Sequence, residues 1–304
     1  MANTIEWGII LQRTLDRHMI QNLTSGWMDS NAGQVQYTGG KEIKVPIMQT
    51  QGLGDYGRNT TGYPVGNIDL RYQTFEMRMD RGREFNFDRH DVDESNYIVN
   101  ASNVLSVFQA NHVVPEVDSY RYSTIAAGAI AEGYTRDYTP DVDTLLTELM
   151  KDINTIQDRT GATDLIVSMN WLVYGILSRS KELSRNLDAA SFQQGQVQMT
   201  VRGIDGVPIV PVPSARMKTA YVYKDAVTSG QTEGGFTPDA SAKDINWIIC
   251  PRTSPMAITK QDQVKIFEPN VNQTLDSWKT QYRRYHDLWM LENKLPAYMI
   301  NTQP

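Results

Sequence analysis

Residues 41–87 hold two runs of alternating apolar and polar residues on either side of a glycine-rich stretch. The first run, KEIKVPIMQ (41–49), alternates regularly and contains a proline that marks the edge of a sheet. The returning run, NIDLRYQTFEMRMDRGREFNF (67–87), keeps this period except for one slip in phase after Tyr72. Strand, glycine-rich stretch and strand predict a long β-hairpin. Because its flanks are polar on one face, we expect the hairpin to lie on another surface and not inside a core.

A long segment with helical period follows the hairpin. Residues 90–130 place their apolar side chains on one stripe. They predict a helix of about 35 to 40 residues, far above the usual globular length. Asp91 and Glu94 fit a capping box at its start. Pro115 lacks an N–H and clashes with the preceding turn, so we expect it to kink the helix or to split it near Val114.

A module of mixed helices and strands comes next. We expect a helix that is capped by Thr139, has Pro140 at its first position and ends at Gly161. DLIVSM (164–169) predicts a buried strand, and Asn170 fits the cap of a following helix. No repeated βαβ unit or internal repeat is visible, which favours an α+β fold.

The remaining segments predict strands and an arm. IDGVPIVPVP (204–213) predicts a turn and an edge strand, because three prolines remove donors that a central ladder needs. INWIICP (245–251) predicts a strand that returns to the body, and the tail (277–300) offers two further strand-like runs. Residues 1–40 hold one short amphipathic stretch, 9–20, within polar sequence. We therefore expect an extended or weakly structured arm there.

The glycine-rich stretch contains a literal G-x-G-x-x-G at Gly52, Gly54 and Gly57. A dinucleotide site needs a helix that opens directly from the last glycine, because the helix N-terminus binds the pyrophosphate. The residues after Gly57, RNTTGYPVGN, include two further glycines and a proline, and no helix can start there. We therefore interpret the stretch as a hairpin tip, with a nucleotide-dependent oxidoreductase as the remaining alternative.

No catalytic or metal-binding constellation stands out in the sequence. The four histidines are scattered, and none has a partner at metal-ligand spacing. Cys250, the only cysteine, follows apolar residues and is most simply a small buried residue. We therefore expect a protein that is not an enzyme and has no catalytic residues, cofactor or metal.

Arginine replaces lysine over a long part of the chain. Residues 45–150 contain no lysine but eight arginines. Arginine pairs with carboxylates in a planar, bidentate way and is preferred at interfaces. The pattern is either a chance bias on solvated strands or a sign that hairpin and helix contact other subunits. The candidate contact residues are Gly52, Gly54, Asp55, Tyr56, Arg58, Tyr63, Arg71, Arg78, Arg81, Arg83, Glu116, Asp118 and Arg121.

The stretch VVPEVDSYRYSTIAAG (113–128), inside a long helix after a two-stranded hairpin, carries a resemblance. It resembles the spine helix of tailed-bacteriophage major capsid proteins, which have the Hong Kong 97-like fold. The order of the other segments agrees over essentially the whole chain. The resemblance implies an N-terminal arm at 1–40, an E-loop hairpin at 41–82, a peripheral domain with the spine helix at 83–137 and 246–304, and an α/β axial domain at 138–245.

This resemblance implies a structural function. Many copies would form hexamers and pentamers that close an icosahedral shell around double-stranded phage DNA, with the E-loop and the arm reaching neighbouring subunits. The net charge of −6 opposes a broad basic face that grips nucleic acid, so DNA would be enclosed without sequence-specific binding. The implied partners are a scaffolding protein, a portal and decoration proteins. The implied location is the virion capsid, assembled in the bacterial cytoplasm without a membrane.

Two features depart from the family pattern. Some relatives cross-link through a lysine near the hairpin tip, but residues 45–82 contain none. Some relatives begin with a long helical scaffolding segment that a protease removes. Here the arm is short, so a separate scaffolding protein is expected unless the sequence is already the cleaved form. Within the same fold, the alternative is an encapsulin-like nanocompartment that loads enzymes, although its usual helical N-terminal segment matches the polar arm poorly.

Overall fold

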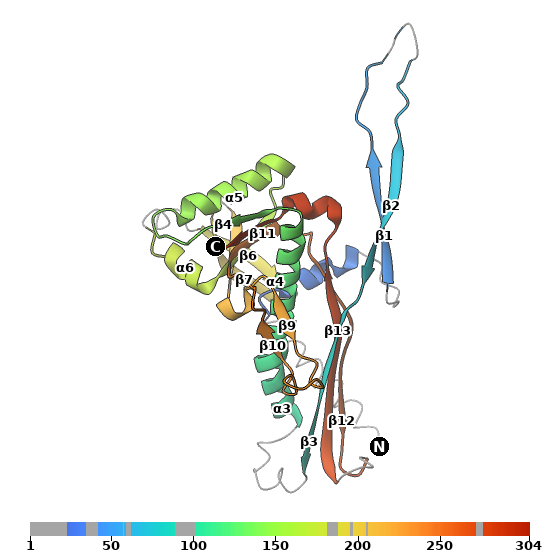
Figure 1. Cartoon of the computed structure of the whole chain (residues 1–304), viewed down its shortest axis with the longest axis vertical. Helices are drawn as coiled ribbons and strands as arrows, with labels where there is room; N and C mark the ends of the chain where they lie inside the picture. Colours follow the sequence, from blue (N-terminus) through green and yellow to red (C-terminus); the bar gives the residue numbers. More distant parts are fainter. Residues whose placement is uncertain are drawn as a thin grey trace.

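The computed structural model shows an elongated chain with three visible parts (Figure 1). A hairpin projects at one end, a three-stranded ribbon runs beside a long helix, and a larger sheet is layered between helices. No helix in the described part of the chain is long and apolar enough to cross a membrane. The structure describes residues 23–34, 42–56, 58, 62–88, 101–180, 188–194, 197–204, 206–271 and 276–304.

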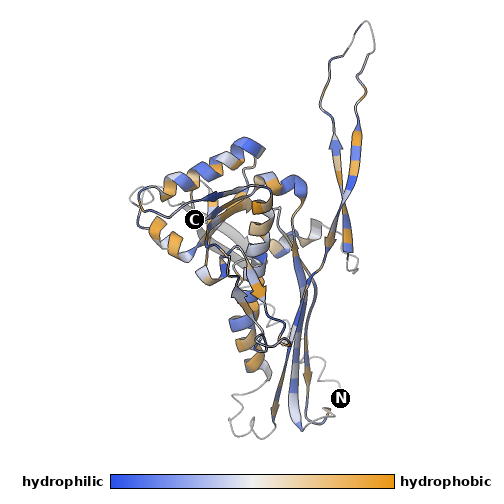
Figure 2. Ribbon diagram, in the orientation of Figure 1, coloured by the Kyte–Doolittle hydropathy of each residue, from blue (hydrophilic) through white to orange (hydrophobic). Residues whose placement is uncertain are grey.

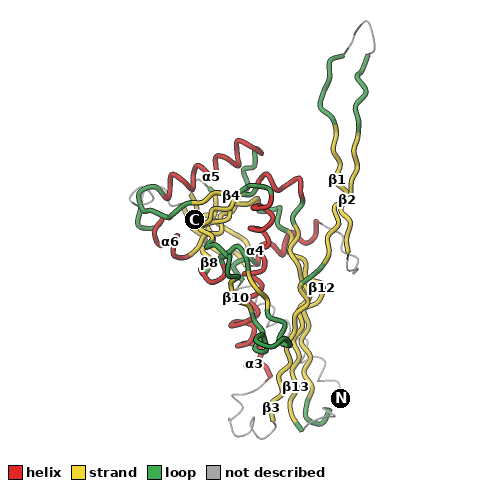
Figure 3. Tube along the Cα trace, in the orientation of Figure 1, coloured by secondary structure: helices red, strands yellow, loops and turns green. Residues whose placement is uncertain are grey.

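The predicted hairpin is confirmed. Strands β1 (Glu42–Thr50) and β2 (Ile68–Glu76) pair antiparallel along their full length. The N–H of Gln51 donates to the carbonyl of Asn67 at 3.4 Å, and the chain then continues as loop (Figure 3). The described residues between the two strands contain no helix. The G-x-G-x-x-G stretch, whose Gly57 lies outside the described residues, is therefore the tip of a hairpin.

The returning run divides into two strands, and its slip in phase after Tyr72 lies inside the first of them. β2 ends two residues before β3 (Met79–Asp88), which pairs with a different partner. That partner is β13 (Ser277–Trp289), which also pairs with β12 (Met256–Phe267). The three strands form the ribbon, in the order β12-β13-β3. One predicted strand is thus two strands that belong to two sheets.

One unbroken helix runs beside this ribbon. It comprises α3 (Ala101–Phe108), a π-helical segment η2 (Gln109–Val113) and α4 (Val114–Ala131). We call residues 101–131 the long helix. Its predicted start, including the capping box at Asp91 and Glu94, lies outside the described residues.

Pro115 neither splits nor ends the long helix. The N–H of Val114 donates to the carbonyl of Gln109, five residues earlier, in place of the usual four. This wider π turn comes directly before the proline, whose ring would crowd a standard α turn and which has no N–H to donate. The predicted disturbance is therefore present, in the form of a π-helical turn.

The larger sheet has seven strands in the order β4-β14-β11-β5-β8-β7-β6. β5 and β11 are entirely buried strands, as their apolar runs predict. The tail supplies β14 in addition to β13, which confirms its two strand-like runs. The bounds are β4 (Thr135–Asp137), β5 (Leu165–Asn170), β6 (Asp188–Gln194), β7 (Val197–Ile204), β8 (Val207–Val212), β11 (Ile245–Pro251) and β14 (Met299–Thr302).

Helices cover both faces of this sheet. On one face, α5 (Leu145–Thr160) and α6 (Trp171–Leu177) pack on side chains that include Trp247. On the other face, α4 packs on a cluster that includes Cys250. Cys250 is completely buried, as predicted, and burial raises the pKa of its thiol.

The helix predicted to start at Pro140 begins later. Its N-cap is Thr144, not Thr139. The side chain of Asp141 accepts a hydrogen bond from the N–H of Asp143 at 2.9 Å, which forms a local turn that competes with a helical start.

Two other predicted helix boundaries are confirmed. Gly161 ends α5 with a left-handed φ of 67°. Asn170 caps α6, because its side chain accepts a hydrogen bond from the N–H of Leu172 at 3.0 Å. The remaining short elements are η1 (Gly26–Gln34), η4 (Ser214–Arg216), β9 (Tyr221–Tyr223), β10 (Phe236–Pro238) and η5 (Glu292–Ala297).

The prediction of an edge strand over 204–213 is wrong. β8 lies inside the sheet, parallel to β5 on one side and antiparallel to β7 on the other. However, β7 pairs only with the first two residues of β8. Beyond Pro208, the side of β8 that faces β7 has no ladder partner among the described strands, so Pro211 can sit there without breaking one.

The expectation of a weakly structured arm is wrong for residues 23–34, which we call the anchor segment. Leu23, Trp27 and Met28 are buried in the core, and Trp27 and Met28 belong to the cluster around α4. The parts of the predicted arm at 1–22 and 35–40 lie outside the described residues.

Candidate functional site

The hairpin carries a concentrated group of exposed apolar side chains. Figure 2 shows apolar positions along both strands, well away from the body of the chain. A soluble chain rarely exposes many large apolar side chains together unless they form a contact site. The exposed large apolar residues of this region are Met48, Leu53, Tyr56, Tyr63, Val65, Ile68, Leu70 and Tyr72.

The apolar side of the hairpin changes face along its length. Near the base, the cross-strand pair Ile43–Phe75 is buried against the body of the same chain. Farther out, the pair Met48–Leu70 is 65% and 51% exposed. Successive side chains of a strand point to opposite faces, and cross-strand partners share a face. The outer apolar pairs therefore lie on the face opposite to the one that the body covers.

We call this outer face the distal face of the hairpin. It is formed by Pro46, Met48, Ile68, Leu70 and Tyr72. A two-stranded hairpin alone is marginally stable in water, so it needs a second surface to rest on. Because its own body covers the other face at the base, the distal face is a candidate contact surface for another molecule.

The base of the hairpin is firmly held by its own chain. The ring of Phe75 stacks on Trp289, with centroids 5.1 Å apart and planes at 14°. The amide of Gln73 donates to the carbonyl of Met290 and accepts from the N–H of Glu292, both at 3.1 Å. The hairpin therefore leaves the body from a packed and hydrogen-bonded base.

The VPEVDSYR motif of the long helix ties several elements together inside the chain. Glu116 forms an ion pair with Arg81 of β3 at 2.7 Å. Arg81 also donates to the carbonyls of Lys224 and Gly235, at 2.7 and 3.2 Å, and thereby holds the loop after β9. This matches the bidentate, multi-donor chemistry for which arginine is suited.

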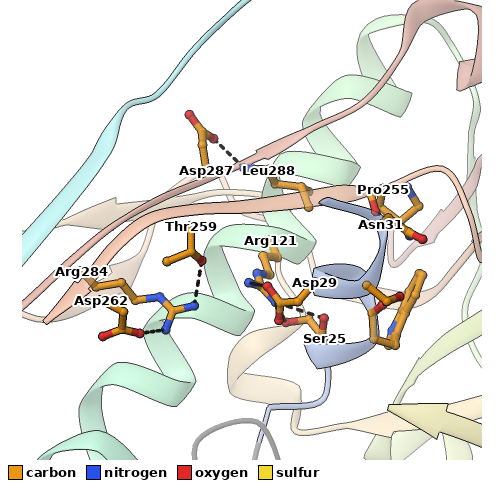
Figure 4. A network of polar contacts seen from close by, with 12 residues as sticks. Ser25, Asp29, Asn31, Arg121, Pro255, Thr259, Asp262, Arg284, Asp287 and Leu288 are labelled. Atoms are coloured by element: carbon orange, nitrogen blue, oxygen red, sulfur yellow. Dashed lines mark hydrogen bonds and ion pairs between the residues drawn. The ribbon is translucent and has the colours of Figure 1, made fainter. Parts of the chain in front are cut away.

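Asp118 and Arg121 of the same motif hold the anchor segment. Both are completely buried. Arg121 pairs with Asp29 (Figure 4). Asp118 accepts hydrogen bonds from Ser25 and from Arg216. These two side chains are inaccessible at the surface of the chain, which corrects the expectation that they contact another subunit.

The other candidate contact residues divide into two groups. Arg81 and Glu116 are engaged with each other, and Arg71 pairs with Glu292 of the same chain at 2.9 Å while both stay about half exposed. The remaining candidates lie on the hairpin, on β3 or, for Arg78, in the short connection between β2 and β3, and their inter-subunit role stays a prediction. They are Gly52, Gly54, Asp55, Tyr56, Arg58, Tyr63, Arg78 and Arg83.

The sequence reasoning missed the side chains of the distal face. The candidates drawn from the sequence are glycines, arginines, acidic residues and the tyrosines Tyr56 and Tyr63, whereas the omitted Met48, Ile68 and Leu70 are apolar and exposed. The slip in phase after Tyr72 is the sequence feature that marks them, because it moves the apolar positions from one face of the hairpin to the other.

No metal centre is found among the residues that the structure describes. No group of three or more His, Cys, Asp or Glu side chains there is placed to hold a metal ion.

His286 is buried on β13 and lies edge-on to Tyr120 of the long helix, with ring centroids 5.6 Å apart. Burial and the nearby arginines Arg284, Arg121 and Arg81 lower the pKa of His286 well below 6.5.

This buried imidazole predicts a pH dependence of stability. Below pH 6.5 the unfolded chain binds a proton at His286 that the folded chain does not. The contribution of His286 to the free energy of unfolding is therefore complete above pH 6.5 and is lost as the pH falls below that value. We expect the loss to approach about 1.4 kcal/mol per pH unit. His286→Phe should remove this part of the slope. Urea unfolding of the unassembled chain and the variant between pH 7.5 and 5.5 measures it, and parallel profiles would contradict the assignment.

Among the comparisons with known proteins, only the one with solved structures finds matches. No protein-family model and no curated protein matches the sequence. A solved structure from Microbacterium phage Oxtober96 matches with a TM-score of 0.58 and 10% identity, over 89% of this chain and 88% of that chain. The bacteriophage PhiM1 mature capsid matches with a TM-score of 0.56 and 13% identity, over 86% and 82%. The capsid structure of the cyanophage P-SCSP1u matches with a TM-score of 0.56 and 12% identity, over 88% and 85%.

At such identities the likeness concerns the fold. It extends over most of this chain and of each matched chain. It also agrees with the order of elements described above, in which a projecting hairpin precedes a long helix and a layered sheet. The chain has the Hong Kong 97-like α+β fold of phage major capsid proteins.

Proposed function

We propose that this chain is the major capsid protein of a tailed bacteriophage, and that its copies assemble into an icosahedral shell around double-stranded DNA. The observation that carries the proposal is the distal face, an apolar surface on a projecting hairpin that its own chain leaves exposed. The fold likeness to chains of phage capsids supports it.

Assembly would proceed through contacts between unlike surfaces. The distal face of one copy lies on a different surface of the next, and such head-to-tail contacts close into rings when the rotation between copies is right. Hexamers and pentamers are the rings that an icosahedral shell needs. Each contact can be modest, because closure repeats it around every subunit.

The charge of the chain suits an enclosing wall. A formal net charge of −6 gives little attraction for phosphate, so packed DNA would be contained without being gripped. The proposal includes no base-specific contact and no enzymatic step.

The proposal also includes the domain assignment that the family resemblance implies. Residues 41–82 act as the E-loop, 83–137 with 246–304 as the peripheral domain, and 138–245 as the axial domain. A scaffolding protein, a portal and decoration proteins would join during assembly in the bacterial cytoplasm, and the finished chain would reside in the virion.

Co-expression of the chain with its phage partners tests this function. We expect electron microscopy to show closed shells of one main diameter, and nuclease treatment of the native particles to leave protected DNA inside. A chain that stays a monomer with all partners supplied would contradict shell assembly. Shells that contain a protein cargo in place of DNA would contradict the virion role.

A further inference from the structure

The anchor segment (23–34) is fastened to the long helix by buried polar contacts. Asp118 accepts hydrogen bonds from the N–H and the hydroxyl of Thr24, at 3.1 and 2.9 Å. It also accepts from the N–H and the hydroxyl of Ser25, at 3.1 and 2.5 Å, and from the guanidinium of Arg216 at 2.9 Å. One fully buried carboxylate therefore receives five donors from two separate segments.

A second buried contact holds the middle of the anchor segment. Arg121 is completely buried and donates to both carboxylate oxygens of Asp29, at 2.6 and 3.1 Å, and to the carbonyl of Ser25 at 3.1 Å (Figure 4). Farther along, the amide of Asn31 donates to the carbonyls of Arg252 and Pro255, at 2.7 and 2.9 Å. The segment is thus fixed at three points over its length.

The far end of the anchor segment touches the base of the hairpin. Ala32 packs against the cluster that contains Ile43 of β1, Phe75 of β2 and Trp289 of β13. The segment lies between the long helix and this base (Figure 1). The anchor segment therefore contacts the base of the hairpin directly.

We propose that Asp118 and Arg121 are positioning residues for the hairpin, which act through the anchor segment to set the direction in which the hairpin leaves the body. Between Glu42 and Gly54 the hairpin extends about 40 Å at ~3.4 Å per residue. A change of about 10° at its base would therefore move the tip by about 7 Å, more than the separation at which side chains make contact. The consequence for shell assembly rests on the proposed function.

A distance measurement on the unassembled chain tests the positioning role. Spin labels go on Leu53→Cys at the exposed tip and on Val107→Cys at an exposed position of the long helix, while fully buried Cys250 stays unlabelled. We expect one narrow distance distribution in the labelled parent. With Asp118→Asn, we expect it to broaden or shift by several ångströms. An unchanged distribution would overturn the proposal.

A matched control separates positioning from a general loss of stability. Asp152 is also completely buried and accepts from Trp247 at 3.0 Å, but its partners are outside the anchor segment. Asp152→Asn should therefore lower the melting temperature while leaving the distance distribution like that of the parent. The same broadening in both variants would overturn the proposal. If Asp118→Asn does not fold, Ser25→Ala removes only the hydroxyl contacts and should shift the distribution in the same direction.

Shell morphology provides the assembly readout. When parent shells form, we expect Asp118→Asn to give mixed diameters and Asp152→Asn to give parent-like shells. Equal morphology in the two variants would overturn the assembly consequence. An absence of parent shells would count against the proposed function only, because the distance measurement uses unassembled chains.

Discussion

A chain that lacks residues 52–66 is expected to fold normally and to form no closed shells. The deletion joins Gln51 to Asn67, which leaves a two-residue connection between the paired residues Thr50 and Ile68. Two-residue connections are the commonest in β-hairpins. The described residues of the deleted segment are exposed or half-exposed, so the free energy of unfolding should change by less than about 0.5 kcal/mol.

Circular dichroism, thermal unfolding and electron microscopy together measure this outcome. A chain in which a Gly/Ser linker of equal length replaces residues 52–66 is the matched control for length, and it should also fail to close shells because it lacks the apolar side chains of the tip. Loss of the fold on deletion would show that the tip is part of the core. Normal shells from the deleted chain would show that the tip makes no essential contact.

Leu70→Glu is expected to block assembly while leaving the subunit folded. Leu70 lies on the distal face and is 51% exposed in the isolated chain, so a charge there costs the subunit little. In a contact with another copy, the change removes roughly 1.5–3 kcal/mol of apolar burial and adds the cost of burying a charge. The lost apolar burial alone should therefore raise the concentration needed for assembly by about tenfold to a hundredfold.

Gln49→Glu is the matched control for this change. Gln49 is exposed on the opposite face of the same hairpin, paired with Asp69. Light scattering across a concentration series should give a parent-like assembly threshold for Gln49→Glu and a strongly raised one for Leu70→Glu. Equal thresholds for the two variants would remove the distal face as the contact surface.

Much of the fold follows from local sequence patterns. The hairpin, the long helix and the buried strands β5 and β11 each have a period or an apolar run that a single segment displays. The position of β8 does not, because whether Pro211 breaks a ladder depends on how far β7 follows its neighbour. That information lies in the arrangement of distant strands.

The arginines give a second example: the sequence indicates which of them form ion pairs, but not which residues are their partners. The sequence indicates that Arg81 and Arg121 form carboxylate pairs, and both do. It does not indicate that the carboxylates belong to the same chain, since Asp29 is 92 residues away from Arg121. Only the folded arrangement distinguishes an internal pair from one between subunits.

The sequence pattern does not predict the anchor segment, for a related reason. Its three large apolar residues, Leu23, Trp27 and Met28, are too few to define a period, and most of the other residues are polar. It is held instead by Asp118 and Arg121, more than 90 residues away. Segments that are fixed by distant polar partners leave no periodic trace of their own.

A cryo-electron microscopy map of the assembled particle at side-chain resolution would show which surface the distal face contacts. We predict that the hairpin of each copy lies on a second copy, with Met48, Ile68, Leu70 and Tyr72 of the distal face buried in that contact. Shells in which these side chains remain exposed to solvent, or fold back onto their own chain, would show that the distal face is not the contact surface between copies.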